Sequence, residues 1–231
     1  ASHLGGQVPL LSKTPHRRDY KIITDWLERQ ARRSGVLVRL GSEMTAEKVL
    51  AAKPDAVIVA TGARDTRPRL PGAHLPHVYT AREALAGAPL GSRVLIGDWD
   101  GRNMGMSMAE WLAVRGHVVE IVSSAFRIGE DAELMTWHPA YERLMNLGVK
   151  LSAMEELVEI TEDHAVIRLL NSDTREAACD SVVLCSRGSA ENDLYHALKG
   201  QVPSLWLIGD AFTPRQLEQA IYEGAKVARE I

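Results

Sequence analysis

The chain has 231 residues, of which 45% are hydrophobic and 25% charged, and its formal net charge is −3. This composition is ordinary for a soluble globular protein that buries a sizeable core. It leaves no basic surface of the kind that binds nucleic acid, and no apolar run approaches the ~18 residues of a membrane-spanning helix, so neither nucleic acid nor a membrane is an expected partner.

The first part of the chain alternates between helical and strand patterns. A turn at Gly5, Gly6 and Gln7 lets the backbone approach a ligand closely and precedes an irregular stretch over 8–15. Three prolines within 64–76 predict a crossover between two lobes. The elements predicted between these segments are a helix over 20–34, a strand over 36–40, a helix over 46–52 capped by Thr45, and a strand over 56–60.

The middle of the chain begins with a strand–helix–strand unit and ends with an insertion. Alternating apolar and polar residues over 165–170 predict a half-exposed antiparallel hairpin before a buried strand at 181–184. The other elements predicted here are a short helix capped by Thr80 and ending near Gly87, strands over 93–97 and 117–122, a helix over 104–115 closed by Gly116, a helix over 134–146, strands over 149–152 and 157–161, and a short helix over 193–198.

The turn after the strand over 93–97 lacks the glycine pattern that binds dinucleotides. Gly97 is followed by Asp98 and Asp100, with no Gly-x-Gly-x-x-Gly in phase with the strand end. The two carboxylates would place negative charge where a pyrophosphate needs hydrogen-bond donors. We therefore expect a lobe that keeps the dinucleotide fold without a working dinucleotide site.

The two cysteines, Cys179 and Cys185, lie in one segment of strand type. An extended strand would hold them roughly 20 Å apart, beyond the reach of a disulfide. Buried free thiols indicate a reducing, cytoplasmic compartment, and two are too few for a four-cysteine iron–sulfur cluster. The histidines show no metal-ligand spacing, so no metal site is expected.

The stretch over 204–224 predicts a strand over 205–208 that turns at Gly209 and Asp210 into a helix. Thr213 is expected to cap this helix, with Pro214 as its first residue. Unpaired backbone N–H groups and the positive end of the helix dipole would meet at the turn, which suits a phosphate or a reduced flavin ring. Any strand-to-helix crossover of an α/β protein has this pattern, so the turn alone assigns no cofactor.

A set of motifs occurs in one order along the chain. The motifs are Ser2-His-Leu-Gly-Gly-Gln7, His16-Arg-Arg-Asp-Tyr20, Val57-Ile-Val-Ala-Thr-Gly-Ala63, Leu70-Pro-Gly72, Ala109-Glu-Trp-Leu-Ala113 and Ile208-Gly-Asp-Ala211 with Pro214-Arg215. Their order and spacing resemble the C-terminal nucleotide-binding region of the trimethylamine dehydrogenase and 2,4-dienoyl-CoA reductase group, whose members are similar to the old yellow enzymes. The resemblance covers essentially the whole chain.

This resemblance implies an α/β fold with two Rossmann-like lobes of the disulfide-reductase type and a small antiparallel insertion. Residues 1–66 and 187–231 would form the first lobe, without its opening strand and Gly-x-Gly-x-x-Gly, and residues 67–186 would form an NAD(P)-binding-like lobe without a fingerprint. The implied cofactor-binding residues are Gly5, Gly6 and Gln7 along the dinucleotide, Ala60, Thr61 and Gly62 beside the adenosine half, Gly209 and Asp210 at the pyrophosphate or ribityl region, and Arg215 near the helix start.

The missing nicotinamide fingerprint resembles the amine dehydrogenase members of the group. Those enzymes oxidise amines at FMN in an N-terminal barrel, pass electrons through a [4Fe-4S] cluster, and hold ADP or FAD in the region that this chain resembles. The resemblance thus implies a non-catalytic ADP- or FAD-binding part of an oxidoreductase that acts on CH–NH bonds, with FMN and the cluster outside this chain. Expected partners are the barrel, in the same polypeptide or a companion chain, an electron-transfer flavoprotein, and a second copy of the chain.

Two alternatives stay open. An FAD-carrying, NAD(P)H-dependent enoyl- or dienoyl-CoA-type reductase module would need a dinucleotide site near Gly97, which the aspartates oppose. A non-catalytic module for assembly, or for docking an electron carrier, would need no nucleotide. Reduction by NAD(P)H separates the first alternative from the other interpretations.

Overall fold

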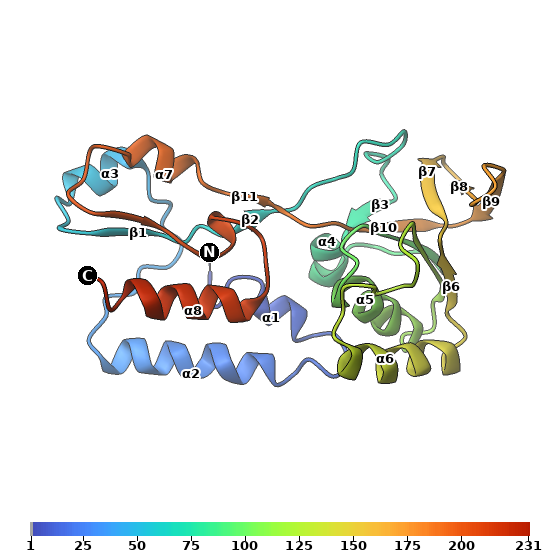
Figure 1. Cartoon of the computed structure of the whole chain (residues 1–231), viewed down its shortest axis with the longest axis horizontal. Helices are drawn as coiled ribbons and strands as arrows, with labels where there is room; N and C mark the ends of the chain where they lie inside the picture. Colours follow the sequence, from blue (N-terminus) through green and yellow to red (C-terminus); the bar gives the residue numbers. More distant parts are fainter. Residues whose placement is uncertain (1) are drawn as a thin grey trace. The chain divides into compact units, whose positions relative to one another are not determined.

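The computed structural model describes residues 2–231, which divide into two compact units (Figure 1). Unit 1 comprises residues 2–6, Gln30–Thr66 and Arg187–Ile231, and unit 2 comprises Gln7–Arg29 and Arg67–Ser186. Each unit contains parallel strands of its own. The chain leaves unit 1 after Thr66 and returns to it at Arg187. None of the helices in the described part of the chain is long and apolar enough to cross a membrane.

Unit 2 is built on a five-stranded sheet. Every neighbouring pair of strands in it is parallel. A parallel sheet of this kind is covered on both faces, which is why its strands are nearly continuous apolar runs. The strand order is β3 (Val78–Thr80), β10 (Ser181–Cys185), β4 (Arg93–Asp98), β5 (Val118–Ser123) and β6 (Lys150–Ala153). The predicted α/β fold with a Rossmann-like parallel sheet is confirmed.

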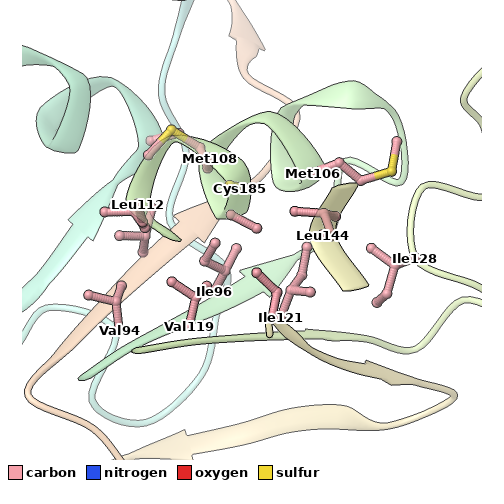
Figure 2. Close-up of a cluster of buried hydrophobic side chains, with 14 of the residues drawn as sticks. Val94, Ile96, Met106, Met108, Leu112, Val119, Ile121, Ile128, Leu144 and Cys185 are labelled. Carbon is pink, nitrogen blue, oxygen red and sulfur yellow. The ribbon is translucent and has the colours of Figure 1, made fainter. Parts of the chain in front are cut away.

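Helices cover one face of this sheet. Side chains of α5 (Asn103–Ala113) and α6 (Leu134–Asn146) pack against alternate residues of β4 and β5 (Figure 2). The bounds of α6 are those predicted from its helical period. The labelled members of this core are Val94, Ile96, Met106, Met108, Leu112, Val119, Ile121, Ile128, Leu144 and Cys185.

The opposite face of the sheet packs against an antiparallel insertion of three strands. These are β7 (Glu156–Ile160), β8 (His164–Arg168) and β9 (Thr174–Ala178), in that order. The predicted hairpin is therefore present, but it has a third strand that the sequence pattern does not reveal. The pattern fails there because β9 reads Thr-Arg-Glu-Ala-Ala, in which only Ala177 is buried.

A capped helix links β3 to the core of unit 2. The Thr80 hydroxyl accepts a hydrogen bond from the Glu83 N–H, and the Glu83 carboxylate accepts one from the Thr80 N–H. This capping box starts α4 (Ala81–Ala86) at the predicted residue. Gly87 ends the helix in the left-handed conformation, with φ of 112°.

Both cysteines are buried and free, as predicted. Burial raises the pKa of the Cys179 thiol to about 11, and it raises the pKa of Cys185 well above its usual value. Both thiols are therefore protonated at neutral pH, and a protonated, buried thiol is a poor nucleophile. Their place in the fold is that of small core residues.

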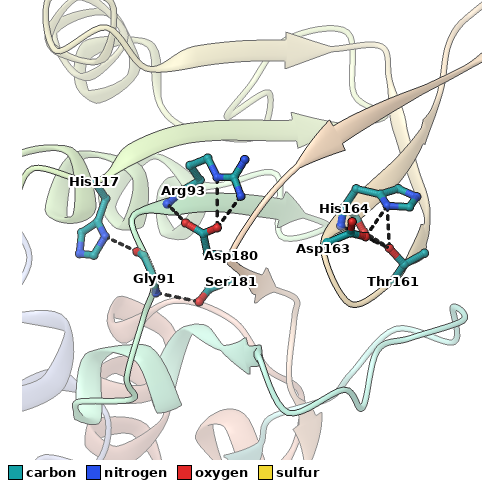
Figure 3. Close-up of polar contacts among 8 residues, drawn as sticks. All are labelled: Gly91, Arg93, His117, Thr161, Asp163, His164, Asp180 and Ser181. Carbon is teal, nitrogen blue, oxygen red and sulfur yellow. Dashed lines mark hydrogen bonds and ion pairs between the residues drawn. The ribbon is translucent and has the colours of Figure 1, made fainter.

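Asp180 fixes the start of β4 against the start of β10 (Figure 3). Its carboxylate accepts hydrogen bonds from the Arg93 N–H at 2.8 Å and from the Arg93 guanidinium at 2.6 Å. Beside it, the Gly91 N–H donates to the Ser181 hydroxyl at 2.9 Å. A Cβ on Gly91 would lie 2.3 Å from that of Asp180, so this close approach requires glycine. The polar contacts set the register of the two central strands.

The turn between β7 and β8 contains a pH-sensitive pair (Figure 3). His164 Nδ1 lies 2.8 Å from an Asp163 carboxylate oxygen, and this hydrogen bond raises the pKa of His164. The stability that the pair contributes is therefore present below the pKa of His164 in the unfolded chain, and is lost as the pH rises through the raised folded pKa.

We expect an NMR titration of the His164 ring to give a pKa above the usual value. Asp163→Asn should return it toward that value; identical titrations of the two proteins would contradict the assignment.

Unit 1 is a smaller α/β assembly. β1 (Val57–Val59) pairs in parallel with β12 (Leu205–Leu207), and the short strands β2 (Ala63–Arg64) and β11 (Ser189–Ala190) pair antiparallel. Its helices include α3 (Ala46–Ala51), α7 (Asp193–Leu198) and α8 (Leu217–Val227). Thr45 caps α3 as predicted, by accepting a hydrogen bond from the Lys48 N–H. A small core comprises Val49, Val59 and Leu198.

Two predictions near the N-terminus are wrong. Residues 8–15, expected to be irregular, include the short helix α1 (Val8–Leu11), for which Pro9 provides a fixed φ in the first turn. Residues 36–40, expected to be a strand, form no ladder with any strand in residues 2–231, and Leu37 is 75% exposed. A β-favouring composition forms a strand only where a partner supplies hydrogen bonds. The long helix α2 (Tyr20–Arg33) agrees with its prediction within one residue.

Candidate functional site

The turn after β12 carries three of the predicted cofactor-binding residues. Gly209 begins a single 3-10 turn, η1 (Gly209–Ala211), with a left-handed φ of 63° that favours glycine. The Asp210 carboxylate accepts a hydrogen bond from the Arg215 N–H at 3.0 Å. The structure therefore brings Gly209, Asp210 and Arg215 together at one turn.

This hydrogen bond also explains a wrong prediction. Thr213 does not cap a helix and Pro214 is not its first residue, because residues 213–216 are not helical and α8 begins at Leu217. Gln216 is the N-cap instead, and it forms a capping box with Gln219. Asp210, by binding the Arg215 N–H, holds the chain away from helical geometry until that point.

A residue absent from the prediction completes the turn. The Glu223 carboxylate, from the second turn of α8, accepts a hydrogen bond from the Gly209 N–H at 2.7 Å and pairs with the Arg215 guanidinium. Arg215 also lies over the Phe212 ring, 5.7 Å from its centroid. No local pattern could reveal this contact, because Glu223 is separated from Gly209 by the whole turn and the first part of α8.

The predicted turn after β1 lies in the same unit. The Thr61 hydroxyl donates to the backbone oxygen of Glu191, and the Glu191 N–H donates to the Gly62 oxygen at 2.9 Å. Gly62 has a φ of 84°, and a Cβ added there would meet nothing within 4 Å. Ala60 is exposed beside it. This turn is thus tied to the segment before α7, and Gly62 is required by its backbone conformation and not by crowding.

The glycine-rich turn near the N-terminus is divided between the two units. Gly5 and Gly6 have left-handed φ values of 93° and 57° and belong to unit 1. Gln7 belongs to unit 2, where it precedes α1 as its N-cap residue. The left-handed backbone at both glycines agrees with a tight turn.

In unit 2, the turn between β4 and α5 contains the carboxylate of Asp98, which is hydrogen-bonded within the turn. Asp98 is 4% exposed, and its Oδ1 accepts hydrogen bonds from the N–H groups of Asp100 at 3.1 Å and Gly101 at 3.3 Å. A Cβ on Gly105, in the first turn of α5, would lie 2.6 Å from the Asp98 carboxyl carbon. The helix therefore begins directly over this carboxylate. Two donors that a pyrophosphate would use are occupied, so the residues present do not fit an NAD(P) pyrophosphate.

The donor set of unit 1 fits an anionic cofactor better. A backbone N–H at Gly209 and a guanidinium at Arg215 converge on one carboxylate, which is the arrangement that also binds phosphate oxygens. A pocket of 260 Å³ in unit 2 lies between α5 and α6 and is lined by Glu110 and Arg143, among others, but by none of the predicted cofactor-binding residues. Among the described residues, no group of three or more His, Cys, Asp or Glu side chains is placed to bind a metal.

Comparisons with known proteins agree with this fold. The NADH oxidase of Thermoanaerobacter brockii is 30% identical over 99% of this chain and 36% of its own length. The probable N-methylproline demethylase of Rhizobium meliloti is 28% identical over 100% of this chain and 39% of its own length. The solved complex of 2-naphthoyl-CoA reductase with 2-naphthoyl-CoA has a TM-score of 0.94 and 25% identity, and covers all of this chain and 35% of that one.

The chain thus spans little more than a third of the length of these three proteins. Relatives named for amine oxidation and for reduction match along the same region, which confirms the resemblance to the trimethylamine dehydrogenase and dienoyl-CoA reductase group. The family model described as pyridine nucleotide-disulphide oxidoreductase matches residues 44–224. The chain therefore belongs to the pyridine nucleotide-disulphide oxidoreductase family.

Proposed function

We propose that the chain is the ADP- or FAD-binding part of an oxidoreductase that acts on small amines. Unit 1 holds the nucleotide, with Gly209, Asp210 and Arg215 at its pyrophosphate or ribityl region, Gly5 and Gly6 along the dinucleotide, and Ala60, Thr61 and Gly62 beside its adenosine half. Bound FAD would supply electron transfer, whereas bound ADP would supply none. The amine is oxidised elsewhere, at FMN in a barrel that also carries a [4Fe-4S] cluster.

One observation carries the choice between amine dehydrogenase and reductase. The buried Asp98 carboxylate occupies the N–H groups of Asp100 and Gly101, where the pyrophosphate of NAD(P)H would have to bind. Binding there would expel a buried carboxylate from its hydrogen bonds or place it against a phosphate, and either change is costly. A lobe closed in this way supports an enzyme whose electrons enter from an amine and not from NAD(P)H.

The same proposal extends to the surroundings of the chain. Its partners are the barrel, in one polypeptide or as a companion chain, an electron-transfer flavoprotein that accepts the electrons, and a second copy of the chain. The two buried free thiols support a cytoplasmic location.

A reductase remains the second candidate, because the relative that is 30% identical is named an NADH oxidase. In that case NAD(P)H would reduce FAD bound in unit 1.

A single preparation separates the two candidates. The purified protein is denatured, the released nucleotide is identified by chromatography and absorbance, and a second sample is mixed anaerobically with NADH and with NADPH. We expect about one equivalent of ADP or FAD, and no reduction of any flavin by either dinucleotide. Rapid, stoichiometric bleaching of a flavin would establish the reductase. If the folded protein binds no nucleotide even when ADP or FAD is added, the result would support a non-catalytic module for assembly or for docking an electron carrier.

A further inference from the structure

One carboxylate holds two donors of the turn after β12. Glu223 Oε2 accepts a hydrogen bond from the Gly209 N–H at 2.7 Å, and Oε1 pairs with the Arg215 guanidinium. These are the two groups assigned above to the cofactor phosphate. Because carboxylate and phosphate oxygens accept charge-assisted hydrogen bonds from the same donors, Glu223 lies where a bound anion would lie.

The donors do not depend on Glu223 for their placement. The Arg215 N–H is bound to the Asp210 carboxylate at 3.0 Å, and its Nε donates to the Thr213 oxygen at 3.3 Å. Its guanidinium is also held over the Phe212 ring. The Gly209 N–H is fixed by the left-handed backbone of the turn. If the Glu223 side chain moved away, both donors would remain aimed at the vacated position.

Glu223 is able to leave, in contrast to Asp98. Asp98 binds N–H groups two and three residues further along its own buried loop. Glu223 lies on α8, 14 residues from Gly209 along the chain, and its side chain is 20% exposed and so already in contact with water. Burial raises the pKa of Glu223, but hydrogen bonds from Arg215 and the Gly209 N–H hold it below its usual value. The group is therefore a charged anion at neutral pH.

We propose that Glu223 is a displaceable internal anion, which competes with the phosphate of the bound nucleotide for the Gly209 N–H and for Arg215. The inference rests on the proposed function, because it takes unit 1 as the nucleotide-binding unit. With the carboxylate in place the empty turn has no unsatisfied donor at Gly209. Binding of the nucleotide swings Glu223 outward and transfers both donors to the phosphate.

Glutamine at position 223 tests this competition, because it keeps the side-chain size and removes the charge. Calorimetric titration of nucleotide-free protein with ADP should give a dissociation constant about tenfold lower for Glu223→Gln than for the wild type, since a charged competitor is lost. Glu218→Gln removes the same charge from an exposed position in the first turn of α8 and should stay within about twofold. If Glu223 only supported the turn, the Glu223→Gln protein would instead bind ADP more weakly than the wild type. Equal or weaker binding by Glu223→Gln therefore overturns the proposal.

A second probe keeps this result separate from the proposed function. The amide resonance of Gly209 is followed by NMR while inorganic pyrophosphate is added, and it should shift at a lower concentration in Glu223→Gln. If ADP and FAD bind neither protein but pyrophosphate behaves as expected, the nucleotide function fails and the competition stands. If ADP binds while the Gly209 amide never responds to pyrophosphate or to ADP, the nucleotide function stands and the competition fails.

Discussion

Replacing Arg143 by methionine is expected to lower the free energy of unfolding of unit 2 by about 3 kcal/mol, the lower end of the usual cost of removing one partner of a buried ion pair. The Arg143 guanidinium donates to both carboxylate oxygens of Glu110, at 2.6 and 3.2 Å. The Glu110 side chain is only 6% exposed, and in the variant its remaining ionic partner among the described residues is His16, whose Nε2 lies 3.3 Å from Glu110 Oε1. The measurement is urea unfolding followed by far-ultraviolet circular dichroism.

Two further variants give this prediction a sharp comparison. Arg168→Met removes a pair with Glu156 in which both side chains are about half exposed, and it should cost less than ~1 kcal/mol. The double variant Glu110→Gln with Arg143→Met leaves no buried charge at this place and should recover part of the loss. A single Arg143→Met variant as stable as Arg168→Met would show that the buried pair does not stabilise unit 2.

Replacing Gly72 by alanine is the second change with a large expected effect. Gly72 has a φ of 79°, and a Cβ there would lie 1.8 Å from the backbone oxygen of Ile160. The backbone cannot separate without breaking the hydrogen bond from the Ile160 N–H to the Pro71 oxygen, which is 3.0 Å long. Left-handed strain and overpacking together are expected to cost about 3 kcal/mol, measured as a lowered urea midpoint.

Gly148 provides the matched control for this change. Its φ of 72° is similar, but an added Cβ there would meet nothing within 4 Å. Gly148→Ala should therefore show the conformational cost alone, roughly 1–2 kcal/mol. Equal losses at the two positions would mean that the contact between the turn at Gly72 and the end of β7 contributes nothing.

The sequence predicts elements well where the cause of the structure is local. The helical period and the flanking residues define α6 completely, and Thr80 with Glu83 defines the start of α4. The prediction fails where the structure of a segment depends on a partner far away in the sequence. Residues 36–40 have a strand-like composition but pair with no strand in the described residues, whereas β9 is polar and becomes a strand because β8 pairs with it.

The candidate site follows the same division. The turns at Gly62 and Gly209 are recognisable because only glycine suits their backbone, and the charge at Asp98 is visible without a structure. That the Asp98 carboxylate accepts from the N–H groups two and three residues further along its loop, and that Glu223 reaches back to Gly209, depends on side-chain geometry. The sequence contains both acids without indicating either contact.

Three strand pairs are nested in the sequence, because each inner pair lies between the two strands of the next outer pair. They are β3 with β10, β2 with β11 and β1 with β12. On a ribosome, the first strand of each pair would be made long before its partner. Joining β3 to β10 first shortens the loop that each outer pair must close, which lowers the entropic cost of closing it. We therefore expect the pair β3–β10 to form first and the pair β1–β12 last. β1 has no β12 to pair with until Leu207 has been synthesised. Such long-range pairing slows folding and leaves an apolar strand open to wrong partners in the meantime.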